Sequence, residues 1–259
     1  MYTLLSPAKK LDLAPNGTGL NTTLPDLIAD SSKLAGTLRA MSAGQLGDLM
    51  KLSENLANLN HARYQTWAPP FTAENAKAAA LMFAGDTYTG LDAPSLSDDD
   101  LHWSQDHLGI LSGLYGLLRP LDLIQPYRLE MGTKLGNARG KNLYAFWGQS
   151  LSQTINARTT AHADRTIINL ASQEYFKAIK TKALKGTVIT PAFKEVKKGQ
   201  AKVIGFMAKK ARGMMARHIV LNRIETPEGL KAFTGGGYAY QPAESTDINW
   251  VFTRPSTTA

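Results

Sequence analysis

Helical and strand-like patterns alternate along the whole chain, and this alternation restricts the fold more than any other feature of the sequence. Short β-rich runs such as 2–5 and 166–169 are each followed by longer segments with the apolar spacing of a helix. The 259 residues contain no internal repeat and no low-complexity tract. The pattern therefore predicts a mixed α/β (α+β) fold, with one interwoven domain over residues 1–259 and helices around a mixed sheet.

The helices expected from apolar spacing and capping signals cover much of the chain. In the segment 43–64 the leucines and Met50 fall on one broad apolar face. Ser97 and Asp100 have the spacing of a capping box, which marks the start of a helix. The expected helical segments are 24–40, 43–64, 97–107, 142–156, 172–180, 208–222 and 227–233.

The expected strands are fewer, and two of them are joined by a short turn. Strands are predicted at 2–5, 166–169, 187–196 and 201–206, and near Tyr238 and Trp250. The residues 197–200, Lys-Lys-Gly-Gln, indicate a hairpin between 187–196 and 201–206. Pro191 indicates that its strand lies at an edge or has a bulge. The segment 109–116 fits either a buried strand with a turn or a short helix.

Positive charge is concentrated in one segment. Residues 177–217 contain twelve lysines and arginines and one acid, for a net charge of +11, whereas the whole chain carries +8. Such a field attracts polyanions, and neutralisation of phosphates supplies most non-specific affinity for nucleic acids. The alternative is a solvated lysine face that keeps the protein soluble. On the helix 208–222, Lys209, Arg212 and Arg217 share an arc opposite Met207, Met214 and Leu221.

Several classes of protein are excluded by what the chain lacks. It has no cysteine, so disulfides, thiolate metal sites, iron–sulfur clusters and cysteine nucleophiles are all excluded. Its first residues do not have the order of a signal peptide, and no apolar run has the length of a membrane span. No dinucleotide fingerprint, phosphate loop or helical histidine pair is present. We therefore expect a cytoplasmic protein with no cofactor and no bound metal.

The segment 111–132 combines arginines, tyrosines and acids with glycines, prolines and leucines. A run of this kind can place polar groups around one cavity, and the candidates are Ser112, Tyr115, Arg119, Asp122, Tyr127, Arg128 and Glu130. Arg128 and Glu130 are two positions apart, so on a strand they share a face and can both point into the cavity. The alternative is a buried ion pair that fixes the register of a loop.

Lys9 and two groups of aromatic residues are further candidates. Lys9 follows a strand and the Ser6–Pro7 pair, where a partly desolvated amine could act as a nucleophile; a solvated lysine is the alternative. The aromatic residues could stack bases of a distorted nucleic acid, or could pack in the core. These residues are Tyr144, Phe146, Trp147, Tyr238 and Tyr240.

A series of short motifs extends along the whole chain. They are 6–9 (Ser-Pro-Ala-Lys), Asn60 with Arg63 and Tyr64, 85–88, 111–122, 127–132, 142–144 with Phe146 and Trp147, 169–172 with Glu174 and Tyr175, 209–213 (Lys-Lys-Ala-Arg-Gly), and 250–252 with Arg254. Together and in this order, they resemble the motifs of the YaaA family of bacterial peroxide-stress proteins. Lys10 departs from the pattern, since threonine is more usual there.

The resemblance implies a cytoplasmic protein that protects cells from hydrogen peroxide by limiting free iron and oxidative DNA damage. It also implies DNA binding through a basic cleft and a helix-hairpin-helix element. That element fits best within 34–56, where two predicted helices meet around residues 41–44, and second best within 109–116. The resemblance supplies no catalytic residues.

Three functions remain open at this stage. The first is DNA binding by shape rather than sequence, to duplex or distorted DNA, with no membrane and no obligate protein partner. Its contacts would come from Arg119, Tyr127, Arg128, Lys197, Lys198, Lys209, Lys210, Arg212 and Arg217. The second is a metal-independent enzyme of the base-excising glycosylase or lyase type, with Lys9 as nucleophile, Asp122 or Glu130 as acid/base and Arg128 as phosphate anchor. The third is direct iron binding by the acids at 98–100.

Overall fold

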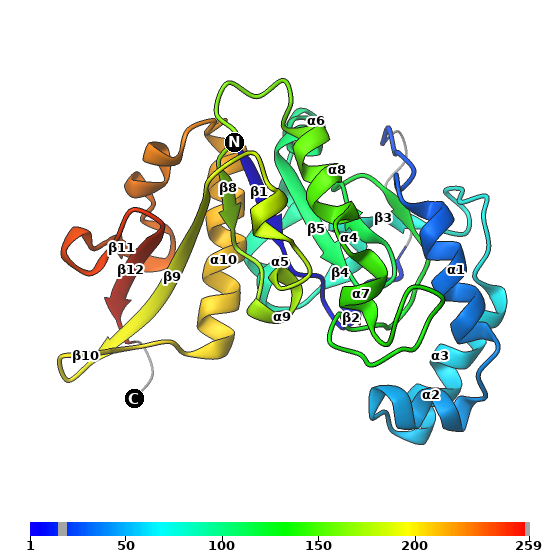
Figure 1. Ribbon diagram of the computed structural model, residues 1–259. Coiled ribbons are helices and arrows are strands. Elements are labelled where there is room, and N and C mark those ends of the chain that lie inside the picture. Colours follow the sequence, from blue (N-terminus) through cyan, green and yellow to red (C-terminus); the bar gives the residue numbers. More distant parts are fainter. Residues whose placement is uncertain (15–19, 257–259) are drawn as a thin grey trace.

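A computed structural model describes residues 1–14 and 20–256, and it has the predicted mixed α/β fold (Figure 1). Its centre is an eight-stranded sheet in the order β11-β12-β9-β8-β1-β5-β6, with β10 paired to β9. The strands are β1 Tyr2–Leu5, β5 Leu108–Ser112, β6 Gly116–Leu118, β8 Ile167–Asn169, β9 Val188–Lys197, β10 Gln200–Lys202, β11 Ala239–Tyr240 and β12 Asn249–Pro255. Neighbours from β12 to β5 are parallel, whereas β6, β10 and β11 are antiparallel to their partners.

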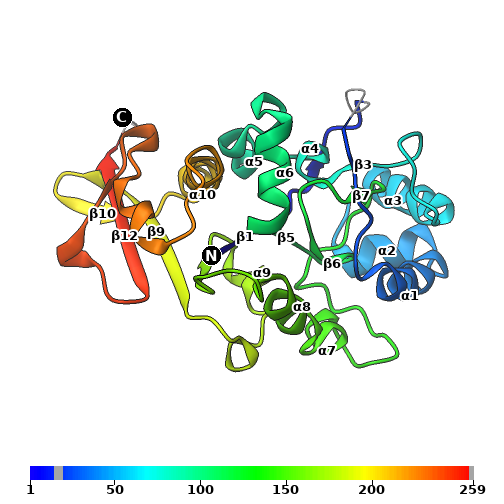
Figure 2. The ribbon, with the colours of Figure 1, turned by 90° about the horizontal axis from the view of Figure 1, so that it is seen from above.

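Helices cover both faces of this sheet. Figure 2 shows α5, α6 and α10 on one face, α7, α8 and α9 on the other, and α1, α2 and α3 grouped beyond β6. The helices are α1 Ile28–Arg39, α2 Ala43–Met50, α3 Glu54–Thr66, α4 Ala79–Met82, α5 Asp86–Leu91, α6 Asp98–His107, α7 Leu143–Trp147, α8 Ser150–Arg158, α9 Gln173–Phe176 and α10 Gly205–Leu221. β1 and β5 are covered on both faces, and every residue of the two strands is buried.

Shorter elements complete the fold. Two small antiparallel pairs lie outside the main sheet: β2 Lys10–Leu11 with β4 Phe83–Ala84, and β3 Lys77–Ala78 with β7 Leu123–Ile124. Short 3₁₀ helices cover Ala93–Ser95, Thr181–Ala183, Pro227–Ala232, Gly235–Gly237 and Pro242–Glu244. Within the described residues, no helix has both the length and the apolar character that crossing a bilayer requires.

Local chemistry explains where the predicted helices begin and where they break. Ser97 and Asp100 form the predicted capping box at the start of α6. The segment 43–64 forms two helices instead of one, because Lys51 adopts a left-handed conformation (φ 52°) after α2. Gly148 (φ 51°) similarly separates α7 from α8 within 142–156. The segment 172–180 is helical only over the single turn of α9.

The β9–β10 hairpin is confirmed, and its turn has the expected geometry. Lys198 and Gly199 both have positive φ (51° and 75°), as a two-residue type I′ turn requires, and Lys197 pairs with Gln200. The second strand ends at Lys202, earlier than predicted, because α10 begins at Gly205.

Pro191 lies within β9, at a position where its missing N–H has no partner to lose. On one side, β9 pairs with β12 from Thr190 onward, and the N–H of Thr190 donates to Ile248. On the other side, its pairing with β8 ends at Ile189. β9 lies between β12 and β8 inside the sheet, so the predicted edge position is wrong. The proline is tolerated because this side of β9 is locally unpaired.

The aromatic residues expected to stack bases are mostly core residues. Phe146, Trp147 and Tyr238 are each at most 3% exposed, so the stacking hypothesis is wrong for them. Tyr144 is half-buried and its hydroxyl donates to the Glu174 carbonyl oxygen, while Tyr240 packs against Trp250 and Phe252. Core packing therefore accounts for this group.

Candidate functional site

A cavity of about 460 Å³ opens directly beyond the carboxyl ends of β1 and β8. The chain passes from β1 to β5 on one side of β1 and later from β8 to β9 on the other, so the strand order reverses between β1 and β8. Open α/β sheets bind their ligands outside the carboxyl ends of the strands at such a switch point. The position of the cavity is therefore the one at which this topology favours a ligand.

Hydrogen bonds hold the two loops of the switch point together. The backbone N–H of Leu170 donates to the Leu4 carbonyl oxygen at 2.9 Å, and that of Ser172 donates to Ser6 Oγ at 2.8 Å. The Tyr88 hydroxyl donates to the Ser6 carbonyl oxygen from α5. The cavity walls are Ser6–Lys10, Ala84–Thr87, Tyr127–Glu130, Leu170, Ser172, Glu174, Tyr175, Lys209 and Arg212.

Lys9, Arg128 and Glu130 meet in this cavity. Lys9 Nζ lies 2.9 Å from Glu130 Oε2, and Arg128 Nη2 donates to Glu130 Oε1 at 3.3 Å. Arg128 and Glu130 both line the cavity, in the arrangement their two-residue spacing indicated. The Lys9 side chain is 62% exposed, so the partly desolvated amine considered from the sequence is wrong. Arg128 Nε is buried without a hydrogen-bond partner among the described residues.

Arg212 is the most distinctive side chain of the cavity. It is half-buried on α10, and burial lowers the pKa of its guanidinium. Among the described residues it forms no side-chain hydrogen bond or ion pair, and the same is true of the exposed Lys10 and Lys209. A half-buried guanidinium without a carboxylate has lost hydration that no protein group replaces, so an anion that enters the cavity binds favourably.

Two glycines place α10 against α5 and so position Lys209 and Arg212. A Cβ atom on Gly213 would lie 1.8 Å from the carbonyl oxygen of Thr87, and one on Gly90 would lie 2.1 Å from that of Lys210. The helices can approach this closely only because both positions lack side chains. Thr87 and Arg212 both line the cavity, so the contact between α5 and α10 fixes how far apart these two lining residues are.

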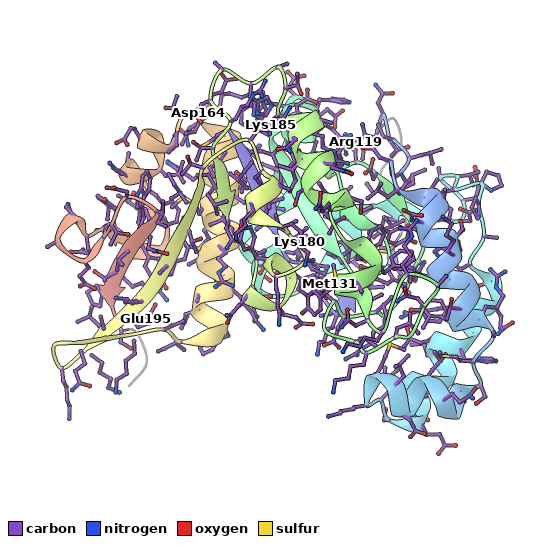
Figure 3. The ribbon with its side chains drawn as sticks, viewed as in Figure 1. Arg119, Met131, Asp164, Lys180, Lys185 and Glu195 are labelled. Atoms are coloured by element: carbon purple, nitrogen blue, oxygen red, sulfur yellow. The ribbon has the colours of Figure 1, made fainter. Side chains whose placement is uncertain are left out.

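The structure places Arg119 and Asp122 away from the cavity. β5 runs parallel to β1, but β6 is antiparallel to β5, so the chain has returned to the amino end of the strands when it reaches Arg119. Figure 3 shows Arg119 near one end of the molecule and Met131, next to Glu130, toward the other. The prediction that segment 111–132 surrounds one cavity is therefore wrong for this part.

Asp122 and Arg119 form a buried, satisfied network. Asp122 is fully buried and accepts hydrogen bonds from Thr23 Oγ1 (2.5 Å), the Arg119 backbone N–H (2.7 Å) and Arg119 Nε (3.1 Å). Burial raises the pKa of the Asp122 carboxyl, and these hydrogen bonds oppose that shift. Ser112 and Tyr115 are also fully buried, although Ser112 shares a 2.7 Å hydrogen bond with the Tyr127 hydroxyl.

The remaining predicted nucleic-acid contacts divide into two groups. Arg217 donates to the Leu91 and Asp92 carbonyl oxygens, so it caps the end of α5. Lys197 and Lys198 lie at the hairpin tip and Lys210 is exposed on α10; none of the three lines the cavity. The expected apolar face of α10 is wrong at Leu221, which is 46% exposed, because the helix packs through Ala208, Ala211, Met215 and Ile219.

A family model described as peroxide stress protein YaaA matches residues 1–244. The chain belongs to this family. Curated proteins named UPF0246 are similar over almost their full length, from Magnetococcus marinus (58% identical over 254 residues, 98% of this chain and 99% of the relative), Ralstonia pickettii (53% over 257 residues, 99% and 100%) and Shewanella amazonensis (50% over 254 residues, 98% and 99%). The family resemblance inferred from the motifs is confirmed.

Sequence reasoning about the site missed residues that the YaaA-family motifs nevertheless contain. Ser6, Ser172 and Tyr175 line the cavity, as does Glu174, whose Oε1 accepts from the Gly132 N–H at 2.8 Å. Their position in the sequence could have indicated them, because Ser6 and Ser172 follow closely after buried strands. Without the strand order, nothing indicated that these two strand ends are neighbours.

A second hollow, of about 530 Å³, lies at the junction of α2 and α3. Gly44, Gly47 and Lys51 are among its lining residues. The preferred location for a helix-hairpin-helix element, 34–56, contains the end of α1, the whole of α2 and only the first residues of α3, which runs from Glu54 to Thr66. The second location, 109–116, is wrong because it forms β5 and the turn into β6.

Acidic and histidine side chains do not gather into a metal-holding group of three or more within 1–14 and 20–256. Asp100 is engaged by the Ser97 cap and by Arg223 at 2.8 Å. Its neighbours Asp98 and Asp99 lie in the same first turn of α6. Nothing in this arrangement favours the iron-binding hypothesis built on 98–100.

Proposed function

We propose that this YaaA-family protein binds DNA across the side of the molecule onto which β1 and β8 open. The observation that carries the proposal is the cluster of Lys10, Lys209 and Arg212 at the switch-point cavity, where none of the three has a hydrogen-bond or ion-pair partner among the described residues. Cations already paired with carboxylates add little affinity for phosphate, whereas these three are available to neutralise it.

Elements beyond the cavity extend the proposed footprint. In Figure 1 the β9–β10 hairpin, the amino end of α10 and the α2–α3 pair all lie toward the side to which the carboxyl ends of β1 and β8 point. The hairpin carries Lys197 and Lys198, and the α2–α3 junction carries Lys51. Contacts of this kind fix the protein on a backbone without reading bases, so we expect recognition of duplex or distorted DNA by shape.

The family's link to peroxide stress gives this binding a physiological setting. In the proposal, the protein acts in the cytoplasm on DNA exposed to oxidative damage. Limitation of free iron, the other property the resemblance implies, remains a prediction, and the DNA-binding proposal does not depend on it.

The direct test is fluorescence anisotropy with labelled duplex, bubble and single-stranded DNA across a salt series. We expect binding that weakens with salt with a log–log slope of roughly −4 or steeper. The double variant Lys209→Gln/Lys210→Gln should weaken binding to every sequence and make the slope shallower by about 1 to 2. Lys185→Gln is the matched control, because Lys185 is exposed at the opposite end of the molecule (Figure 3). No binding at low salt would contradict the proposal.

One observation favours a second candidate function, a metal-independent glycosylase or lyase. Lys9 Nζ and Glu130 lie 2.9 Å apart inside the cavity, a nucleophile beside a proton acceptor. Lys9 Nζ would attack C1′ of a deoxynucleotide, the glycosidic bond would break with its electron pair passing to the base, and Glu130 would accept the amine proton and pass it to the departing base. The C1′–O4′ bond would then break with its electron pair passing to O4′, which water protonates, and this leaves an iminium between Lys9 Nζ and C1′ that borohydride can reduce. Borohydride trapping of a covalent adduct that Lys9→Arg abolishes would support it. DNA binding with no adduct would exclude it.

A further inference from the structure

We propose that the switch-point cavity receives one nucleotide extruded from the bound DNA, with its phosphate on Arg212. This inference rests on the DNA binding proposed above and states what the cavity does during it. A cavity of about 460 Å³ lies within the range of about 300–1,000 Å³ typical of small-molecule sites. A duplex cannot enter such a space, whereas a single nucleotide can.

The position of the phosphate follows from which cations of the cavity are already paired with a carboxylate. Lys9 and Arg128 are both engaged by Glu130, at 2.9 and 3.3 Å. Arg212 and Lys209 line the same cavity from α10 and are not engaged. The planar guanidinium of Arg212 can bind two phosphate oxygens at once, and its partial burial strengthens that interaction.

The rest of the lining suits a base better than a second phosphate. Tyr127 and Tyr175 are buried and contribute aromatic surface, and Leu129 and Leu170 contribute apolar surface. Carboxylates also face the cavity, from Asp86, Glu130 and Glu174. Such groups repel phosphate but accept hydrogen bonds from the amino and imino groups of a base. The lining therefore has a cationic part and a part with aromatic, apolar and carboxylate groups. A ligand with one anionic end and one hydrogen-bonding aromatic end fits both parts.

An exposed aromatic side chain lies on the same helix as the cations of the cavity. Phe206 is 53% exposed and precedes Lys209 by three positions on α10, so the two share a helix face. Val203, two residues before the first residue of α10, is 60% exposed. Proteins that distort DNA insert apolar side chains of this kind between base steps. In the proposal, Phe206 stacks in place of the extruded base.

The test uses the full chain and a duplex with a central 2-aminopurine opposite thymine, because the fluorescence of 2-aminopurine rises when it leaves the stack. We expect a rise of several-fold on binding. Arg212→Gln should weaken duplex binding by a few-fold, as expected for the loss of one phosphate contact among several, and should remove most of the rise even at a protein concentration that saturates the duplex. Arg212→Lys should restore part of it, Phe206→Ala should reduce it, and Lys185→Gln should leave it unchanged.

The outcomes separate the two proposals. Absence of anisotropy change at low salt overturns DNA binding, and with it the extrusion. Normal duplex binding without a 2-aminopurine rise overturns the extrusion alone. A rise that persists in Arg212→Gln, when thermal unfolding shows the variant folded, overturns the assignment of the cavity as the receiving site.

Discussion

Both ends of the central parallel strands carry buried or half-buried arginines, but among the described residues only the carboxyl end has one without a hydrogen-bond or ion-pair partner. At the amino end, Arg158 donates to Asp26 and to the Tyr2 hydroxyl, both at 2.8 Å, and Arg119 contacts Asp26 and Asp122. At the carboxyl end, Arg212 has no such partner in the part of the chain that the structure describes. Paired arginines hold segments of the chain together, whereas an unpaired, half-buried arginine is available to a ligand.

Removal of Asp122 should have the largest effect on stability. Asp122→Ala takes the carboxylate out of a fully buried network and leaves the Arg119 and Thr23 donors without their acceptor. We expect a loss of about 3–5 kcal/mol in the free energy of unfolding, measured by urea denaturation. A loss below about 1 kcal/mol would show that the amino end does not depend on this pairing.

Gly213→Ala should come next. The added Cβ would lie 1.8 Å from the Thr87 carbonyl oxygen, so α10 must move away from α5. We expect a cost of about 1–3 kcal/mol, with DNA affinity reduced because Arg212 moves with its helix. The control is Gly36→Ala, since a Cβ there meets no atom within 4 Å. Equal stability of the two variants would contradict the close helix contact.

The stability of the amino end should also depend on pH. His107 stacks on Trp103 and His162, and burial is the main cause that lowers the pKa of both imidazoles. Between the folded pKa values and 6.5 the unfolded chain binds more protons, so stability should fall as pH falls below about 6.5. Urea unfolding at several pH values should show this slope, and His107→Gln/His162→Gln should reduce it. An unchanged slope in the variant would contradict the assignment.

Arg212→Gln should have the smallest effect on stability, within about 0.5 kcal/mol of the parent protein. Its guanidinium makes no hydrogen bond or ion pair among residues 1–14 and 20–256, so few protein contacts are lost. Thermal unfolding of Arg212→Gln and of Asp122→Ala, measured under the same conditions, compares the stability cost of a substitution at each end. A cost near that of Asp122→Ala would show that Arg212 has a structural role.

Sequence patterns predicted the fold class and several local features, because these depend on residues close together in the chain. The α6 capping box and the 197–200 turn are of this kind, whereas the edge position inferred from Pro191 is wrong because β9 is an interior strand. Prediction of the site required the order of the strands in the sheet, which local sequence patterns do not contain. Arg119 and Arg128 are nine positions apart, yet the β5–β6 reversal places only Arg128 at the cavity. Ser6 and Ser172 became neighbours only through the pairing of β1 with β8.

Hydrogen exchange measured by mass spectrometry, with and without duplex DNA, shows directly which end of the parallel strands DNA covers. Binding at the cavity should slow exchange in segments 6–10, 127–132, 170–175 and 205–213, which surround it. Segments 117–124 and 158–166, at the amino end, should exchange at the same rate in both states. Protection confined to the amino end, or no protection around the cavity when anisotropy shows DNA bound, would contradict binding at the cavity.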